Sequence, residues 1–458
     1  MNEDLPAVTR AVAEHAVETD VSAAPDDVLQ LARRTLIDTV GISIAARNED
    51  AVRILTQTAV EPGAATSTLL TTGARASAAT AALVNGTAAH ALDYDDVTDQ
   101  IYGHPSVVLW PAILAAGEQA RAGGRDMLEA YVVGFDVVTA LADGFASLRE
   151  HYAKGWHSTA TLGVVGAAAA VSRLLGSDVQ RTRCAIALAA TMAGGSRQNF
   201  GTMTKPLHAG LAARDAVVSA TLAANGFTAD PDQLEAPLGY FAMFADRSRL
   251  SAVPSALREP WALRRHGINV KKFPACYNTQ RLADATLRLA ERESIDADEV
   301  RRITVTMEPG GGDPLIHHRP GSGLQGKFSA EYVAAAAVLD RGLGLRTFTD
   351  EAVTRPDARA LVERATLTES PTPPVGPAEW EFAYAVVEVE TAGRGTFVER
   401  ADVPRGDRRA PLSEQELEAK FRDAVDFSGS GWDASALLAE LWDIDASKPF
   451  TGIAALGG

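Results

Sequence analysis

The chain has 458 residues, of which 46% are hydrophobic and 22% are charged, and its mean hydropathy is −0.03. This balance is typical of a folded globular protein, and the length is too great for one ordinary core, so we expect two or more domains. A net charge of −16 repels phosphate and therefore argues against nucleic acid or an anionic membrane as a partner.

The N-terminal stretch MNEDLPAVTRAVAEHAVETD is polar and acidic, and no uninterrupted apolar run long enough for a membrane helix follows it. A signal peptide would begin with a basic flank and an apolar centre. We therefore expect a cytoplasmic protein. The two cysteines, Cys184 and Cys276, are too far apart in sequence to indicate a disulfide framework or a CxxC metal site.

Helical periodicity and capping residues recur from the start of the chain to about residue 226. One helix is predicted to begin at 25–27, with its apolar residues near one face. Further alanine-rich helices are predicted over 75–92, 105–122, 126–148, 157–175, 178–193 and 205–226. Alanine and glycine on several faces of these helices predict close packing inside a large bundle.

The pattern changes after about residue 268. Alternating apolar residues predict a strand over 300–307 and a hairpin over 382–398, and helices are predicted over 278–293 and 328–341. Ser413, with Glu416 three residues later, forms a capping box that begins another helix. The predicted fold is mainly α. We expect a large all-helical domain made of 1–268 and 405–458, with a smaller α+β domain, 269–404, inserted into it.

The first segment that suggests chemistry is ALDYDDVTDQIYGHP at 91–105. Asp93 has apolar neighbours, which indicate a partly buried carboxylate that needs a partner. His104 precedes a helix-starting proline, where the helix dipole attracts anions and disfavours imidazolium. Taken alone, this segment is also compatible with a structural histidine and a solvated acidic loop.

Three more segments follow. GWHST at 155–159 places His157 at another helix start, and the serine and threonine after it are capping residue types. In GTMTKPLHAG at 201–210, Lys205 is one of only seven lysines in the chain. VKKFPACY at 270–277 lies where the helical domain meets the α+β domain, which is a common place for a ligand cleft.

Together these segments, DYDD…GHPS, GWHSTAT, GTMTKPLHAG and KKFPAC, with the weaker GKFSAEYVAAAAVLDRG, resemble the MmgE/PrpD family over nearly the whole chain. The resemblance implies a homodimer in which the α+β domain acts as a lid, and an enzyme that needs neither metal nor organic cofactor. The catalytic residues that it implies are Asp93, His104, His157, Lys205 and Lys271. As candidate substrate contacts we add Thr98, Thr204, His208 and Cys276.

The sequence departs from the aconitate decarboxylases of that family at two places. Val97 stands where they carry a threonine after the acidic pair, and Thr98 follows one position later. Cys276 stands where they carry a histidine.

Known members of the family that the chain resembles are similar to 2-methylcitrate dehydratase, cis-aconitate decarboxylase and iminodisuccinate epimerase. Each of these three reactions develops negative charge beside a carboxylate. We therefore expect a lyase that acts by proton transfer on a small anionic di- or tricarboxylic acid, by dehydration or decarboxylation, with epimerisation as the alternative. Lys205 and Lys271 would bind carboxylates and stabilise the developing charge. His104 and His157 would transfer protons, and Asp93 would orient or charge one imidazole.

Two further alternatives come from the residues. DDVTD at 95–99 matches the DDxxD motif that holds magnesium in all-α prenyl diphosphate enzymes, although no second carboxylate cluster accompanies it. A helical binding protein without turnover would have the same fold, but the intact histidines and lysines argue against it.

Overall fold

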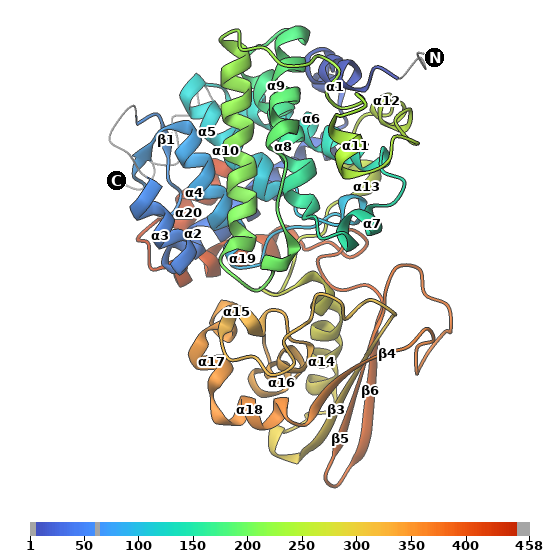
Figure 1. Cartoon of the computed structure of the whole chain (residues 1–458). Coiled ribbons are helices and arrows are strands. Elements are labelled where there is room, and N and C mark those ends of the chain that lie inside the picture. The colour runs from blue at the N-terminus through green and yellow to red at the C-terminus, as the bar shows by residue number, and fades with distance from the viewer. Residues whose placement is uncertain (1–5, 60–64, 447–458) are drawn as a thin grey trace.

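The structure is a computed structural model and describes residues 6–59 and 65–446. Figure 1 shows a large helical body above a smaller body that contains one sheet and several helices. The predicted mainly α fold is confirmed. The longer helices of the upper body are α1 (Val8–Glu18), α2 (Asp26–Ala45), α3 (Asp50–Ala59), α4 (Ala78–Ala91), α5 (Ser106–Ala120), α6 (Gly124–Asp143), α8 (Ser158–Leu174), α9 (Val179–Met192), α10 (Thr204–Ala224), α19 (Glu414–Ser428) and α20 (Ala434–Trp442).

Shorter elements connect these helices. They are α7 (Leu148–Ala153), α11 (Tyr240–Phe244), α12 (Ala252–Leu257), α13 (Ala262–His266) and the two-residue strands β1 (Ser67–Thr68) and β2 (Arg75–Ala76). Every helix predicted between residues 25 and 226 forms, with ends shifted by a few residues. Within the described residues, no helix is long and apolar enough to cross a membrane.

The alanine-rich helices pack as closely as their composition predicts. Where α4 and α10 cross, a Cβ added to Gly86 would lie 2.9 Å from the Cα of Gly210, and one added to Gly210 would lie 2.2 Å from Oγ1 of Thr87. Only glycine fits at this contact. The crossing brings the C-terminal end of α4 beside the N-terminal start of α10.

The starts of α5 and α8 lie at the same end of the bundle. The backbone N–H of His104, before α5, donates to Oγ1 of Thr159 in α8 at 3.1 Å, and the hydroxyl of Ser158 donates to the carbonyl of Tyr102 at 2.8 Å. The expectation that Ser158 or Thr159 caps α8 is therefore wrong, because these hydroxyls join the two helix starts instead. Three helix N-termini thus converge at one end of the upper body, where their dipoles favour an anion.

The lower body is the α+β domain. Its helices are α14 (Gln280–Arg292), α15 (Gly323–Gly326), α16 (Ala330–Asp340), α17 (Asp350–Thr354) and α18 (Pro356–Val362), and its strands are β3 (Val300–Met307), β4 (Ala365–Glu369), β5 (Ala385–Thr391) and β6 (Gly395–Ala401). The strand order is β4-β3-β5-β6, with β3 and β4 parallel and the other pairs antiparallel. Figure 1 shows the helices on one side of this sheet.

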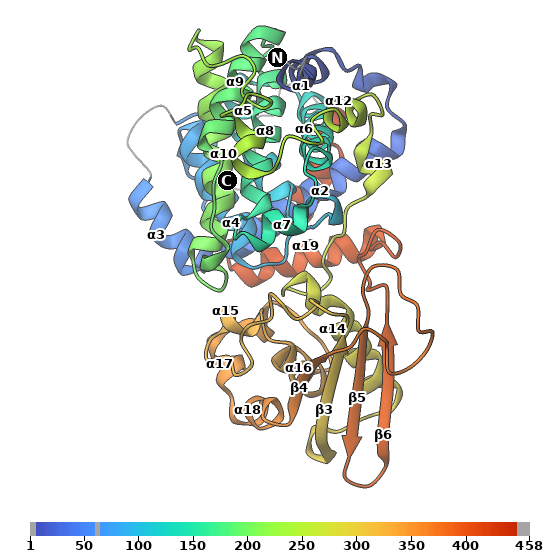
Figure 2. The same cartoon turned by 45° about the vertical axis from the view of Figure 1, so that its right-hand side comes forward.

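After the α+β domain the chain returns to the helical body. The predicted capping box begins α19, which packs against α2 and runs along the base of the upper body in Figure 2. The outgoing and returning segments pair, since the N–H of Val270 donates to the carbonyl of Gly406 at 2.9 Å and the N–H of Arg408 donates to Oδ1 of Asn269 at 2.8 Å.

Two separate hydrophobic cores match the two bodies. One core contains residues from α1 to α13 together with α19, α20 and Leu345, and the other contains most of the remaining buried apolar residues between Phe273 and Ala401. These cores support a helical domain interrupted by an insertion. The boundaries at 268 and 405 stay a prediction, and the segments 1–5 and 447–458 of the helical domain lie outside the described residues.

Candidate active site

The turn that follows α4 is held by lysines from three distant segments. Three consecutive carbonyls in this turn each accept a hydrogen bond from an ammonium group: Leu92 from Lys327 at 2.7 Å, Asp93 from Lys271 at 2.8 Å and Tyr94 from Lys420 at 2.9 Å. Asp93 itself has a φ of 51°, a left-handed conformation that costs a non-glycine residue roughly 1–2 kcal/mol. The three ammonium groups stabilise this turn and so fix the direction of the Asp93 side chain.

The carboxylate of Asp93 pairs with two lysines. Its Oδ1 lies 2.5 Å from Nζ of Lys205 and 3.4 Å from Nζ of Lys271. Burial alone would raise the pKa of Asp93, but the two ammonium groups hold it well below its usual value. Burial would likewise lower the pKa of Lys205, and the contact with Asp93 outweighs it and raises this pKa. Asp93 and Lys205 therefore stabilise each other's charged forms.

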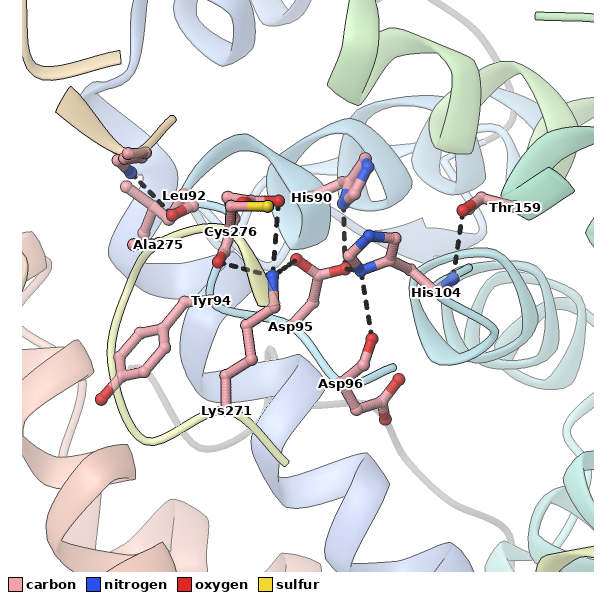
Figure 3. A network of polar contacts seen from close by, with 12 residues as sticks. His90, Leu92, Tyr94, Asp95, Asp96, His104, Thr159, Lys271, Ala275 and Cys276 are labelled. Atoms are coloured by element: carbon pink, nitrogen blue, oxygen red, sulfur yellow. Dashed lines mark hydrogen bonds and ion pairs between the residues drawn. The ribbon is translucent and has the colours of Figure 1, made fainter. Parts of the chain in front are cut away.

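A second buried carboxylate, Asp95, is shared by two histidines. Its Oδ2 lies 2.7 Å from Nδ1 of His104 and 2.9 Å from Nδ1 of His90 (Figure 3). Nδ1 of His104 also lies 3.1 Å from the carbonyl oxygen of Asp96. Because every partner is an acceptor, both Nδ1 atoms carry hydrogen and Nε2 of His104 is the basic nitrogen.

The rings in this cluster are neutral because they are buried. Burial lowers the pKa of His90 to about 3, and it lowers the pKa of His104 against the opposing effect of Asp95. Burial would raise the pKa of Asp95, but the two imidazoles and Lys271 hold it well below its usual value. Within the described residues, the neighbouring Asp96 has no imidazole or ammonium partner of this kind, and burial raises its pKa well above the usual value. The pKa values of these adjacent carboxyl groups are thus shifted in opposite directions.

The third imidazole, His157, completes the cluster. Its ring centroid lies 5.7 Å from that of His90 and 6.5 Å from that of His104, and Phe200 closes one side at 5.0 Å. Burial, followed by the positive field of the neighbouring groups, lowers its pKa well below the usual value. Its Nδ1 lies 3.3 Å from Nδ1 of His208. His157 can therefore exchange a proton on one nitrogen while His208 occupies the other.

The α+β domain supplies the remaining wall. Cys276 lies beside Lys271 in Figure 3, and burial followed by the charge of Asp93 raises the pKa of its thiol to about 11, so it is not a nucleophile at neutral pH. The ring centroid of Phe328 lies 5.0 Å from Nζ of Lys205, and a Cβ added to Gly201 would lie 2.8 Å from Nε2 of His317, which belongs to the α+β domain. The cluster is therefore closed by both domains.

One set of side chains has the spacing of metal ligands. Atoms of His90, Asp95 and His104 lie within 4.8 Å of one another. However, the distances to Asp95 are those of hydrogen bonds, and Nζ of Lys271 lies 4.0 Å from its Oδ1. An ammonium group so close would repel a cation, so these residues fit a hydrogen-bonded acid–base set better than a metal site.

The predicted catalytic residues come together, and the partners of Asp93 differ from those expected. Asp93, His104, His157, Lys205 and Lys271 all belong to this cluster. We expected Asp93 to orient or charge one imidazole, whereas its carboxylate contacts Lys205 and Lys271.

Asp95 orients the rings instead. The sequence analysis missed both Asp95 and His90, although their five-residue spacing across the end of a helix could have indicated a pair. It also missed Lys327 and Lys420, which could have been noticed because the chain has so few lysines.

The four candidate substrate contacts differ in position. Cys276 adjoins the lysines, and His208 lies behind His157. The hydroxyl of Thr98 donates to the carbonyl of Gly267 at 3.2 Å. Thr204 begins α10 and is half-buried. Contact with substrate remains a prediction for all four.

The helical body and the α+β domain thus close on a buried set of imidazoles and paired ammonium groups. Residues 10–252 match the model of the MmgE/PrpD N-terminal domain, and residues 273–444 match that of the MmgE/PrpD C-terminal domain. The chain belongs to the MmgE/PrpD family.

Its relatives include proteins named cis-aconitate decarboxylase. The human protein is 30% identical over 433 residues, covering 91% of this chain and 88% of the relative. The mouse protein is 30% identical over 432 residues, covering 91% and 86%. The cis-aconitate decarboxylase-like protein oryM of Aspergillus oryzae is 26% identical over 453 residues, covering 91% and 90%. The prediction of a lyase of this family is confirmed by these decarboxylase relatives.

Proposed function

We propose that this protein is a cofactor-independent lyase that decarboxylates cis-aconitate or a closely related tricarboxylic acid. The observation that carries the proposal is the pair of buried ammonium groups, Lys205 and Lys271, beside the neutral imidazoles of His104 and His157. Likeness to the cis-aconitate decarboxylases supports the choice of substrate.

In the proposed reaction the lysines bind substrate carboxylates in competition with Asp93. The bond between carbon and the leaving carboxylate breaks, carbon dioxide departs, and its electron pair spreads into the conjugated acid. The lysines stabilise this charge, an effect worth roughly 3–4 kcal/mol per well-placed donor. His157 then donates a proton to carbon, and solvent later returns that proton.

Dehydration, as in a 2-methylcitrate dehydratase, is the second candidate. Asp95 favours it, because an ionised carboxylate on Nδ1 of His104 makes Nε2 a suitable base for the proton beside a carboxylate. His157 would protonate the departing hydroxyl. The same base would also begin an epimerisation of the iminodisuccinate type.

The two remaining alternatives lose support. Asp95 is engaged by two histidines and burial raises the pKa of Asp96, so DDVTD at 95–99 does not present the open pair of carboxylates that magnesium needs. Full activity in excess EDTA is the expected result, and loss of activity restored by magnesium would revive the metal alternative. A binding protein without turnover would leave every test acid unchanged.

One experiment separates these reactions. The protein is incubated in deuterated buffer with cis-aconitate, citrate, 2-methylcitrate and iminodisuccinate, and each acid is followed by NMR. We expect cis-aconitate to yield a dicarboxylate that carries one solvent deuterium. Failure to convert cis-aconitate would refute decarboxylation, whereas exchange or loss of water from another acid would indicate the second candidate. Assembly as a homodimer and residence in the cytoplasm also stay predictions.

A further inference from the structure

His208 is a buried histidine that the proposed reaction does not use directly. It lies on α10, is 6% exposed, and holds its Nδ1 3.3 Å from Nδ1 of His157, which is 1% exposed. One of these nitrogens must carry the hydrogen and the other must accept it. The contact is therefore a hydrogen bond between two rings that can each gain and lose a proton.

A small cavity borders the ring of His208. We call it the α10 cavity; its volume is about 110 Å³, which is room for a few water molecules. Its lining consists of Ala160, Val164, Met192, Gly194, Gly195, His208, Leu211, Ala212 and Asp215. Met192 is 37% exposed, so the cavity extends from the buried imidazole to the protein surface.

The backbone at Gly195 joins the two rings. Its carbonyl accepts the N–H of His157 at 3.0 Å, and a Cβ added to it would lie 3.3 Å from Cγ and Nδ1 of His208. Its φ of 116° is also strained for other residues. Glycine at this position lets the imidazole of His208 approach His157 while facing the cavity.

His157 needs such a neighbour if it donates a proton in every turnover. The ring is buried, Phe200 covers one side, and bound substrate would block solvent from the active site. Each decarboxylation consumes one solvent proton. His157 must therefore be reprotonated either through the protein during the reaction or from solvent after the product has left.

We propose that His208 conducts protons between solvent in the α10 cavity and His157. The inference rests on the proposed function, because it assigns His157 as the proton donor. It makes His208 a relay rather than a substrate contact.

The transfer balances as follows. Nε2 of His208 gains a proton from water in the cavity while its Nδ1 gives a proton to Nδ1 of His157. His157 gives its Nε2 proton to the substrate carbon. One proton enters from solvent and one leaves in the product, and both rings end neutral as their other tautomers. Exchange with water while the site is empty restores the starting tautomers.

Two variants of His208 and one control test the relay with cis-aconitate as substrate. His208→Ala removes the relay, and His208→Asn keeps a hydrogen-bonding group near the position of Nδ1 but has none at Nε2. We expect kcat to fall about 10- to 100-fold in both variants, with KM little changed. Added imidazole should restore kcat of His208→Ala by entering the enlarged cavity. Leu211→Ala, on the same wall, should keep wild-type kcat and should not respond to imidazole.

The possible outcomes are distinct. Wild-type kcat in His208→Asn would show that His208 only positions His157 and would overturn the relay. A raised KM with unchanged kcat in His208→Ala would instead indicate a substrate contact. A lowered kcat without rescue by imidazole would also overturn the relay. If the wild-type protein converts no cis-aconitate at all, the proposed function fails first, and the relay fails with it.

Discussion

Replacing Asp95 by asparagine tests whether its charge organises the active site. The variant keeps the shape of the side chain and leaves an oxygen to face Nδ1 of His90 and of His104, which lie 2.9 and 2.7 Å from Oδ2 in the wild-type protein. A hydrogen bond to a charged group contributes about 1 kcal/mol more than one between neutral groups. Loss of the Asp95 charge therefore weakens the two hydrogen bonds together by roughly 2 kcal/mol.

The effect on turnover follows from that difference. If this whole hydrogen-bond energy is lost from the stabilisation of the transition state, kcat falls by about 30-fold, since a factor of ten in rate corresponds to about 1.4 kcal/mol. The charge of Asp95 also raises the pKa of His104, so its removal would additionally weaken this imidazole as the base of the second candidate reaction, dehydration. We expect the larger part of the loss in kcat rather than in KM, because neither histidine needs the charge merely to occupy its position.

The assay is the decarboxylation rate at saturating cis-aconitate, with urea unfolding of each variant as a check on folding. Asp96→Asn is the matched control, because Asp96 is adjacent and equally buried, and burial raises its pKa instead of leaving it a low-pKa carboxylate like Asp95. That variant should keep nearly full activity. Wild-type kcat in Asp95→Asn, or equal losses of kcat in both variants, would refute the conclusion that the charge of Asp95 organises the active site.

Lys205→Ala leaves Asp93 buried with one partner fewer, so we expect the free energy of unfolding to fall by about 3–5 kcal/mol. We also expect turnover to fall at least about a hundredfold. Wild-type turnover in this variant would contradict the role proposed for Lys205. Gly210→Ala should destabilise the protein by about 1–3 kcal/mol through overpacking, whereas Gly194→Ala, which meets no atom within 4 Å, should not; urea midpoints compare the two. The pKa of His90 is about 3 in the folded protein and roughly 6.5 in the unfolded chain, so between these values the unfolded state binds more protons and stability falls as the pH falls. Urea unfolding across this range should show a shallower slope in His90→Asn, and an unchanged slope would count against the buried neutral ring.

Much of the architecture was predictable because it rests on local patterns. The alanine-rich helices, the strand Val300–Met307 and the capping box at Ser413 each depend on residues close together in sequence. The strand β4 was missed, because it is short and pairs in parallel with β3 only after a long helical crossover. Such pairing leaves no local signal in the sequence.

The members of the site were easier to predict than their partners. Helix starts and scarce lysines pointed to His104, His157 and Lys205, and the structure brings them together. Which carboxylate meets which base depends on the left-handed turn at Asp93, which points its side chain toward the lysines and leaves Asp95 for the histidines. A backbone angle of this kind cannot be read from the residue types.

The pairing of Asp38 with Lys420 has a consequence for biosynthesis. Nζ of Lys420 lies 2.6 Å from Oδ1 of Asp38 in α2, and both the helices from α3 to α13 and the whole α+β domain are translated between them. A nascent chain therefore carries an uncompensated acid in its first helices until α19 emerges from the ribosome. The core of the α+β domain, which lies within the continuous segment from Phe273 to Ala401, should consequently complete its folding before the larger helical domain that precedes it.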